Sequence, residues 1–203
     1  MQLTFLRIDR SPVTDLTPLN GMRLESLFLF EVPVVSLSPI EGMRIWELNL
    51  HTTRVSDLGP LVGLPLDFLH VSDSPVTDLS ILPRLRTSRL VLTGIPATDF
   101  SPLTRLKLTY LRVSNTRFTD LALLRDQPLR ELFLDGCKEL NDLTPLKEVK
   151  LLESLVIPAQ AKDIDFLREM KSLKRLGITD ADLRTTEEFW KGYDARKKQE
   201  KSK

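Results

Sequence analysis

The sequence has only one cysteine, Cys137, and only two histidines, His51 and His70, among its 203 residues. A single cysteine excludes an intramolecular disulfide and suits a reducing compartment. No apolar run approaches the roughly 20 residues that a transmembrane helix needs. The first residues also lack the pattern of a signal peptide. We therefore expect no membrane insertion and a cytoplasmic location.

The chain also lacks an excess of charge of either sign. Its 29 Lys and Arg residues balance 28 Asp and Glu residues, which leaves a formal net charge of +1. Nucleic-acid-binding domains usually carry a basic patch, so we expect no nucleic-acid partner. The one lysine-rich stretch, residues 196–203, is expected to be a disordered, solvated tail.

What the sequence does contain is a repeat in which LxxLxL is followed by D-L-x-P-L. Successive repeats begin 21 residues apart, except for one step of 23 residues from Leu129 to Leu152. Repeats of about 20–29 residues are typical of solenoids, so we expect one domain of nine stacked repeats over residues 1–183. The first positions of the repeats are Leu3, Leu24, Ile45, Leu66, Thr87, Leu108, Leu129, Leu152 and Leu173.

The first half of each repeat predicts a short strand with one buried face. In Leu48-Asn49-Leu50, for example, apolar residues alternate with a polar one, which is the period of a β-strand. The connection between neighbouring strands crosses the back of the molecule, so the sheet is expected to be parallel. A single repeat cannot bury its own apolar face, and stability must come from stacking.

The second half of each repeat predicts one short turn of α or 3₁₀ helix. In Asp15-Leu16-Thr17-Pro18-Leu19 the threonine suits an N-cap and the proline suits the first helical position. The aspartates occupy matching positions one repeat apart, so we expect backbone capping rather than acid–base or metal chemistry. They are Asp15, Asp57, Asp78, Asp99, Asp120, Asp142 and Asp163, with Ser36 as the exception.

This recurring motif resembles the leucine-rich-repeat family, specifically the short-repeat type of the bacterial internalins, which carries D-I/L-x-P-L behind each strand. The resemblance covers Leu3 to about Leu183. It implies an α/β solenoid with a curved parallel sheet on the concave face and short 3₁₀ or α turns on the convex face. It also implies a surface that binds other proteins rather than an enzyme.

The chain departs from the internalin pattern at the turn after each strand, where that type usually has asparagine. We expect hydroxyls at this position to bond the turn backbone, and Val32 and Ile95 to be held by packing. Cys137 is expected to be a small buried residue rather than a nucleophile. The column is Ser11, Val32, Thr53, Ser74, Ile95, Thr116 and Cys137.

The one 23-residue step predicts an irregular junction between the seventh and eighth strands. Its extra residues fall around residues 137–140 and again near residues 149–152. Extra residues behind a strand widen the convex side, so we expect the curvature to change there.

The carboxyl end predicts a capping helix over residues 184–195. Thr185 and Glu188 have the spacing of a capping box. Phe189, Trp190 and Tyr193 follow and are expected to cover the last repeat. The segment TTEEFWKGYD resembles the ending of repeat proteins from large signalling families of environmental bacteria, including planctomycetes. This resemblance implies a part of a larger bacterial signalling or regulatory protein.

At the amino end the first strand begins at Leu3 with no cap before it. We expect this edge not to be a natural end. An uncapped strand edge also predicts edge-to-edge self-association through the first strand.

The strand positions between the buried leucines predict a protein-binding concave face. Aromatic residues interleaved with Arg and Glu are typical of the centres of protein interfaces. We therefore predict a non-catalytic module that binds a protein or peptide and uses no cofactor. The predicted face consists of Phe5, Arg7, Phe28, Phe30, Glu47, Asn49, His51, Phe68, His70, Arg89, Tyr110, Arg112, Glu131, Phe133 and Asp135.

Two other interpretations stay open at this point. The solenoid could be a structural spacer that holds other domains apart. As a minor alternative, His51 and His70 lie on adjacent strands with Glu47 and Asp73 nearby, and two histidines with a carboxylate can bind zinc or iron. An open, shallow surface without second-shell partners argues against a metal site.

Overall fold

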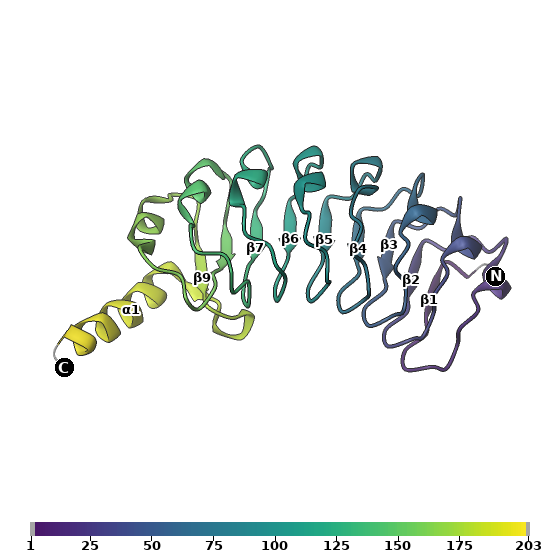
Figure 1. Ribbon diagram of the computed structural model, residues 1–203, viewed down its shortest axis with the longest axis horizontal. Coiled ribbons are helices and arrows are strands. Elements are labelled where there is room, and N and C mark those ends of the chain that lie inside the picture. The colour runs from purple at the N-terminus through teal and green to yellow at the C-terminus, as the bar shows by residue number, and fades with distance from the viewer. Residues whose placement is uncertain (1–2, 202–203) are drawn as a thin grey trace.

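A computed structural model describes residues 3–201 as one elongated solenoid built on a single sheet (Figure 1). The ten strands follow one another in chain order across the sheet. Strands β1 to β9 pair in parallel, and β10 pairs antiparallel with β9. The strands are β1 (Phe5–Arg7), β2 (Ser26–Phe28), β3 (Glu47–Asn49), β4 (Phe68–His70), β5 (Arg89–Val91), β6 (Tyr110–Arg112), β7 (Glu131–Phe133), β8 (Ser154–Val156), β9 (Arg175–Gly177) and β10 (Arg184–Thr185).

Each connection between parallel strands contains one 3₁₀ helix on the opposite side of the solenoid, so the predicted short turns are confirmed. The register places residues one repeat apart side by side, as for Leu27 and Leu48. The 23-residue step keeps this register, because Glu131 lies opposite Ser154. The 3₁₀ helices are η1 (Thr17–Leu19), η2 (Ser38–Ile40), η3 (Gly59–Leu61), η4 (Leu82–Arg84), η5 (Ser101–Arg105), η6 (Leu121–Leu124), η7 (Thr144–Glu148), η8 (Ile164–Glu169) and η9 (Asp180–Asp182).

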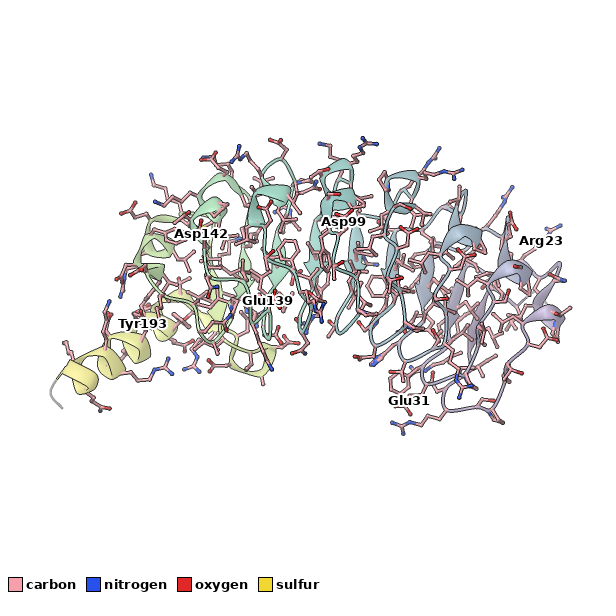
Figure 2. All side chains as sticks on the ribbon, in the orientation of Figure 1. Arg23, Glu31, Asp99, Glu139, Asp142 and Tyr193 are labelled. Carbon is pink, nitrogen blue, oxygen red and sulfur yellow. The ribbon has the colours of Figure 1, made fainter. Side chains whose placement is uncertain are left out.

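The core is a continuous apolar filling between sheet and helices rather than a central globular core (Figure 2). In the second repeat Leu24, Leu27 and Leu29 are all fully buried, and the helix leucine Leu37 is almost fully buried. Burying such a side chain is worth about 1.5–3 kcal/mol. Because the same positions are buried in repeat after repeat, the stability of each layer depends on its two neighbours.

The recurring aspartates cap the 3₁₀ helices, as predicted. Asp15 Oδ1 accepts a hydrogen bond from the Thr17 backbone N–H at 2.8 Å, and Asp99 Oδ1 accepts one from Ser101 at 2.9 Å. The predicted position of the cap was wrong, because Thr17 is the first helical residue and the proline follows it. Asp163 is an exception, since it adopts a left-handed conformation and makes no side-chain cap bond. Asp78 is another, since it accepts from the N–H of Ser80, which lies before η4.

The turn residues after the strands face inward, as predicted. Thr53 Oγ1 donates to the Leu50 carbonyl at 2.9 Å, and Thr116 Oγ1 donates to the Val113 carbonyl at 2.6 Å. Cys137 is buried and its thiol donates to the same Val113 carbonyl at 3.2 Å. Burial raises the pKa of the Cys137 thiol, which makes it a poor nucleophile.

The carboxyl-terminal helix α1 (Thr186–Lys201) closes the last repeat. The predicted capping box forms, with the Thr185 hydroxyl 2.8 Å from Glu188 Oε2 and the Glu188 N–H donating back to the Thr185 hydroxyl. Phe189 and Trp190 are buried in the core, and Tyr193 lies beside them on α1 (Figure 2).

The predicted limits of this cap and of the basic tail were wrong. Residues 184–185 form β10 rather than helix, and α1 continues through residues 196–201. The helix is extended by contacts with η8, where Lys197 Nζ lies 3.1 Å from Asp165 and Arg168 lies 2.6 Å from Asp194. Residues 202–203 of the predicted tail lie outside the described residues.

At the other end, β1 pairs only with β2 among the residues that the structure describes. Leu3 is 47% exposed and Phe5 is 53% exposed, whereas the equivalent Leu24 is fully buried. Leu6 and Ile8 are half-buried. The first layer therefore presents apolar side chains and an open strand edge to solvent.

Candidate protein-binding face

The strand residues that flank each buried leucine project from the sheet on the side opposite the 3₁₀ helices, the side predicted to be concave. We call this side the open face. In β3, for example, Leu48 is fully buried whereas Glu47 and Asn49 are half-exposed. The same alternation in β1 to β7 puts all the predicted binding residues on the open face, in three columns that run across the strands. The first two columns lie on the strands, and the third, with Phe30, His51 and Asp135, lies just after them.

The second to fourth repeats build a continuous row of rings on the open face. Phe30 contacts His51 edge to face with 4.9 Å between ring centres, and His51 lies 5.2 Å from His70. His70 in turn lies 6.3 Å from Phe68, and the Arg89 guanidinium lies 5.0 Å above the Phe68 ring. We call the rings of Phe30, His51, His70 and Phe68 the aromatic track.

Beside this track, Phe5 and Phe28 form a second ring pair with 5.4 Å between their centres. Phe28 is only half-buried. The aromatic track and the Phe5–Phe28 pair therefore both leave part of their ring surface accessible on β1 to β4.

The two histidines of the track have different surroundings. Burial, and to a smaller extent the nearby charges of His51 and Arg112, lower the pKa of His70 to about 4. His51 Nε2 lies 3.3 Å from Asp73 Oδ2, so any charge on this imidazole has a partner. At neutral pH His70 therefore adds an uncharged ring to the middle of the track.

The geometry gives no support to the metal alternative. The two imidazole planes are tilted by 40° to each other, and Asp73 pairs with His51. Among residues 3–201 there is no group of three or more His, Cys, Asp or Glu side chains that could hold a metal ion. The same residues also contain no helix that is long and apolar enough to cross a membrane.

The carboxyl-terminal part of the open face is covered by the chain itself. After β9, residues 178–183, which we call the strap, turn back over the sheet. A Cβ atom on Gly177 would lie 2.9 Å from the Leu183 Cα, so the strap passes directly over this glycine. Asp180 of the strap lies 2.8 Å from Arg112 of β6.

The strap changes the predicted binding face. Phe133 is only 4% exposed and Val156 is fully buried, although both occupy open-face positions. The prediction that Phe133 is an exposed interface residue is therefore wrong. The sign of this covering in the sequence is Gly177. It is the one residue without a side chain in the second column, which begins with Arg7, Phe28 and Asn49, and so it leaves room for the strap.

Arg112 connects the strap to the rings below it. Its guanidinium lies 3.9 Å above the Phe133 ring, and its Nε donates to the Tyr110 hydroxyl at 3.3 Å. Burial disfavours the charged guanidinium, but the hydrogen bonds to Tyr110 and Asp180 more than offset this and raise the pKa of Arg112. Tyr110 and Phe133 also contact each other, with 5.4 Å between ring centres. The open face is thus divided into a part on β1 to β5, which is accessible except at Ser26, Ser72 and Val91, and a strapped part on β6 to β9.

The parallel sheet, the 3₁₀ helices and the capped leucine repeats define the protein as a leucine-rich-repeat solenoid. Among solved structures it is similar to internalin C2 of Listeria monocytogenes, with a TM-score of 0.74, 25% sequence identity, and coverage of 85% of this chain and 79% of that one. It is also similar to the internalin InlF of the same organism, with a TM-score of 0.66 and 21% identity. No protein-family model and no curated protein sequence matches the chain.

The region that matches InlF makes up 85% of this chain but only 59% of the InlF chain. The fold of the protein is the internalin type of leucine-rich-repeat solenoid, as the sequence predicted.

Proposed function

We propose that the protein is a non-catalytic binding module that takes a protein or peptide ligand on the accessible part of the open face. The observation that carries this proposal is the aromatic track, which presents half-buried rings on adjacent strands without a covering segment of the described chain. Five strands at a spacing of about 4.8 Å give this surface a width of about 19 Å, which suits an extended segment or the edge of a folded domain.

The chemistry of the surface supports the same conclusion. Rings of Phe30 and Phe68 provide apolar area, while Arg89, Glu47 and Asn49 around them provide charged and polar groups. Interfaces commonly combine buried aromatic anchors with a polar rim. His70 is uncharged and already largely removed from water in the free protein, so covering it with a ligand costs little further desolvation.

A capture experiment with two matched variants tests this function. The immobilised protein, its Phe30→Ser/Phe68→Ser variant and its Val35→Ser/Trp46→Ser variant would be exposed to lysate of the source organism, and retained proteins would be quantified by mass spectrometry. Val35 and Trp46 are 58% and 42% exposed and do not belong to the three columns of the open face, so they control for loss of surface apolar groups. We expect a ligand that the wild type and the Val35/Trp46 variant retain and that the Phe30/Phe68 variant loses at least tenfold.

The interpretation as a structural spacer predicts a different outcome. In that case both variants would retain the same proteins as the wild type. Membership of a larger bacterial signalling or regulatory protein, and a cytoplasmic location, stay predictions of the sequence.

We also propose that the open edge of β1 allows weak self-association. Phe5 and Leu3 are exposed beside unpaired backbone groups of the strand, and such edges pair readily with other strands. Light scattering should show a concentration-dependent increase in mass for the wild type and for a Trp46→Glu control. Phe5→Glu should abolish the increase, and a wild type that stays monomeric at millimolar concentration would rule this association out.

A further inference from the structure

The connection from the 3₁₀ helix to the next strand is one residue longer in the seventh and eighth repeats than in the first six, although the eighth repeat as a whole keeps the 21-residue period. In the fifth repeat the helix leucine Leu103 and the next repeat's first leucine, Leu108, are five positions apart. The corresponding distances from Leu146 to Leu152 and from Leu167 to Leu173 are six positions. One of the two extra residues is Leu151, which is 48% exposed although it is large and apolar.

A groove of about 420 Å³ lies between these two longer connections, at the ends of η7 and η8. Its apolar lining includes Val149, Phe166 and Met170. Phe166 and Met170 pack against the core but are only partly buried, so they leave apolar surface in the groove.

Lysines surround this apolar lining. Lys147, Lys150 and Lys171 line the groove together with one acid, Glu169. Lys147 Nζ lies 5.2 Å from the centre of the Phe166 ring, and Lys150 Nζ donates to the Lys147 carbonyl at 3.3 Å. Lys150 Nζ also lies 3.9 Å from Glu148 at the edge of the groove. The groove therefore combines an aromatic surface with a positive charge that Lys147 and Lys171 mainly supply.

The grooves between regular repeats have a different composition. The groove between η1 and η2, with a volume of about 480 Å³, contains Arg23 and Arg44 beside two methionines but no aromatic ring. The aromatic ring and the exposed leucine are thus features of the part of the solenoid where both connections are longer.

We propose that the groove between η7 and η8 is a second docking site, which binds an acidic segment of a partner protein that carries an aromatic side chain. The aromatic side chain would pack on Phe166 and Met170, and flanking carboxylates would pair with Lys147 and Lys171. Charge complementarity selects an acidic partner over a basic one, and the apolar lining selects a peptide over a small inorganic anion. This site lies away from the open face and does not depend on the function proposed there.

The test uses the full 203-residue chain labelled with ¹⁵N and a synthetic acetylated peptide with one phenylalanine between two pairs of aspartates. Titration should shift backbone amide resonances of residues 147–151 and 166–172, with half-saturation reached in the micromolar to low millimolar range. Replacing the peptide phenylalanine by serine should weaken binding at least fivefold, and replacing its aspartates by lysines should abolish it.

Variants of the protein make the test specific to the groove. Lys147→Glu/Lys171→Glu should weaken peptide binding at least tenfold. Lys107 occupies the position in a regular repeat that Lys150 occupies at the groove, so Lys107→Glu should leave binding unchanged. Phe30→Ser/Phe68→Ser, on the open face, should also leave it unchanged.

Three results would overturn the proposal. The first is an absence of shifts in the groove at several millimolar peptide. The second is equal weakening by Lys107→Glu, which would mean non-specific charge attraction. The third is an equal response to inorganic phosphate or to the serine peptide, which would mean a simple anion site.

Discussion

Asp180 lies 2.8 Å from the guanidinium of Arg112, although the two residues are 68 positions apart in the chain. The pair ties the strap after β9 to β6, three strands away in the sheet. Beneath it, Phe133 and Val156 are removed from solvent. The strap therefore limits the accessible part of the open face to the amino-terminal repeats.

Removal of Arg112 should loosen the strap without unfolding the solenoid. The ion pair and the stacking on Phe133 together are worth about 1 kcal/mol, so Arg112→Ala should speed hydrogen exchange in residues 178–183 about fivefold. Arg89→Ala is the matched control, because Arg89 also stacks on a phenylalanine and pairs with an aspartate, Asp67. Faster exchange in the strap of both variants, or of neither, would contradict the assigned role of Arg112.

The capping aspartates should make stability fall in acid. The side-chain hydroxyl of Ser101 and then its backbone N–H lower the pKa of Asp99 below its ordinary value. A carboxylate with a lowered pKa in the folded state stabilises the fold above its ordinary pKa, and this stabilisation is lost as the pH falls below about 4. Asp15, Asp78 and Asp142 are held in the same way.

Asp99→Asn separates titration from capping, because the amide oxygen still accepts the hydrogen bond but carries no titrating charge. Its melting temperature should fall less steeply than that of the wild type below pH 4, and Asp99→Ala should melt lower at every pH. Parallel melting curves for the wild type and Asp99→Asn between pH 2 and pH 5 would show that the cap does not contribute as described.

His70 should destabilise the protein over a higher pH range. Its pKa is lowered from 6.5 to about 4, chiefly by burial. The unfolded chain therefore takes up a proton on this side chain before the folded chain does. As the pH falls from about 6.5 to about 4, the free energy of unfolding should decrease by up to about 3 kcal/mol.

The His70 imidazole resonances should titrate with a midpoint near pH 4 in the folded protein. His70→Gln should remove most of the fall in stability between pH 6.5 and pH 4. A midpoint for His70 near 6.5, or an unchanged fall in the His70→Gln variant, would be inconsistent with its burial in the track.

The sequence predicted the features that repeat and missed those that occur once. Leu27 and Leu48 occupy the same position in successive repeats, so the period alone places them in parallel register. The Arg112–Asp180 contact has no counterpart in other repeats, so no periodicity could indicate it. Gly177 was the only local sign of it.

The end of α1 was missed for a related reason. The lysine-rich composition of residues 196–201 is typical of a solvated tail, but Lys197 pairs with Asp165 of η8 once the chain has folded. This contact joins residues 32 positions apart, beyond the reach of local sequence patterns. The proposed binding role of the open face likewise depends on a ligand whose identity the repeat pattern does not encode.

Site-specific photocrosslinking tests the central claim most directly. p-Benzoyl-L-phenylalanine would replace Phe30, Phe68, Phe133 or Trp46 in turn, and each protein would be irradiated with the ligand recovered in the capture experiment. We predict strong crosslinks from positions 30 and 68, on the accessible open face, and none from position 133 under the strap or from position 46 outside the three columns of the face. Crosslinks from position 46 with none from positions 30 and 68 would contradict the proposed binding surface.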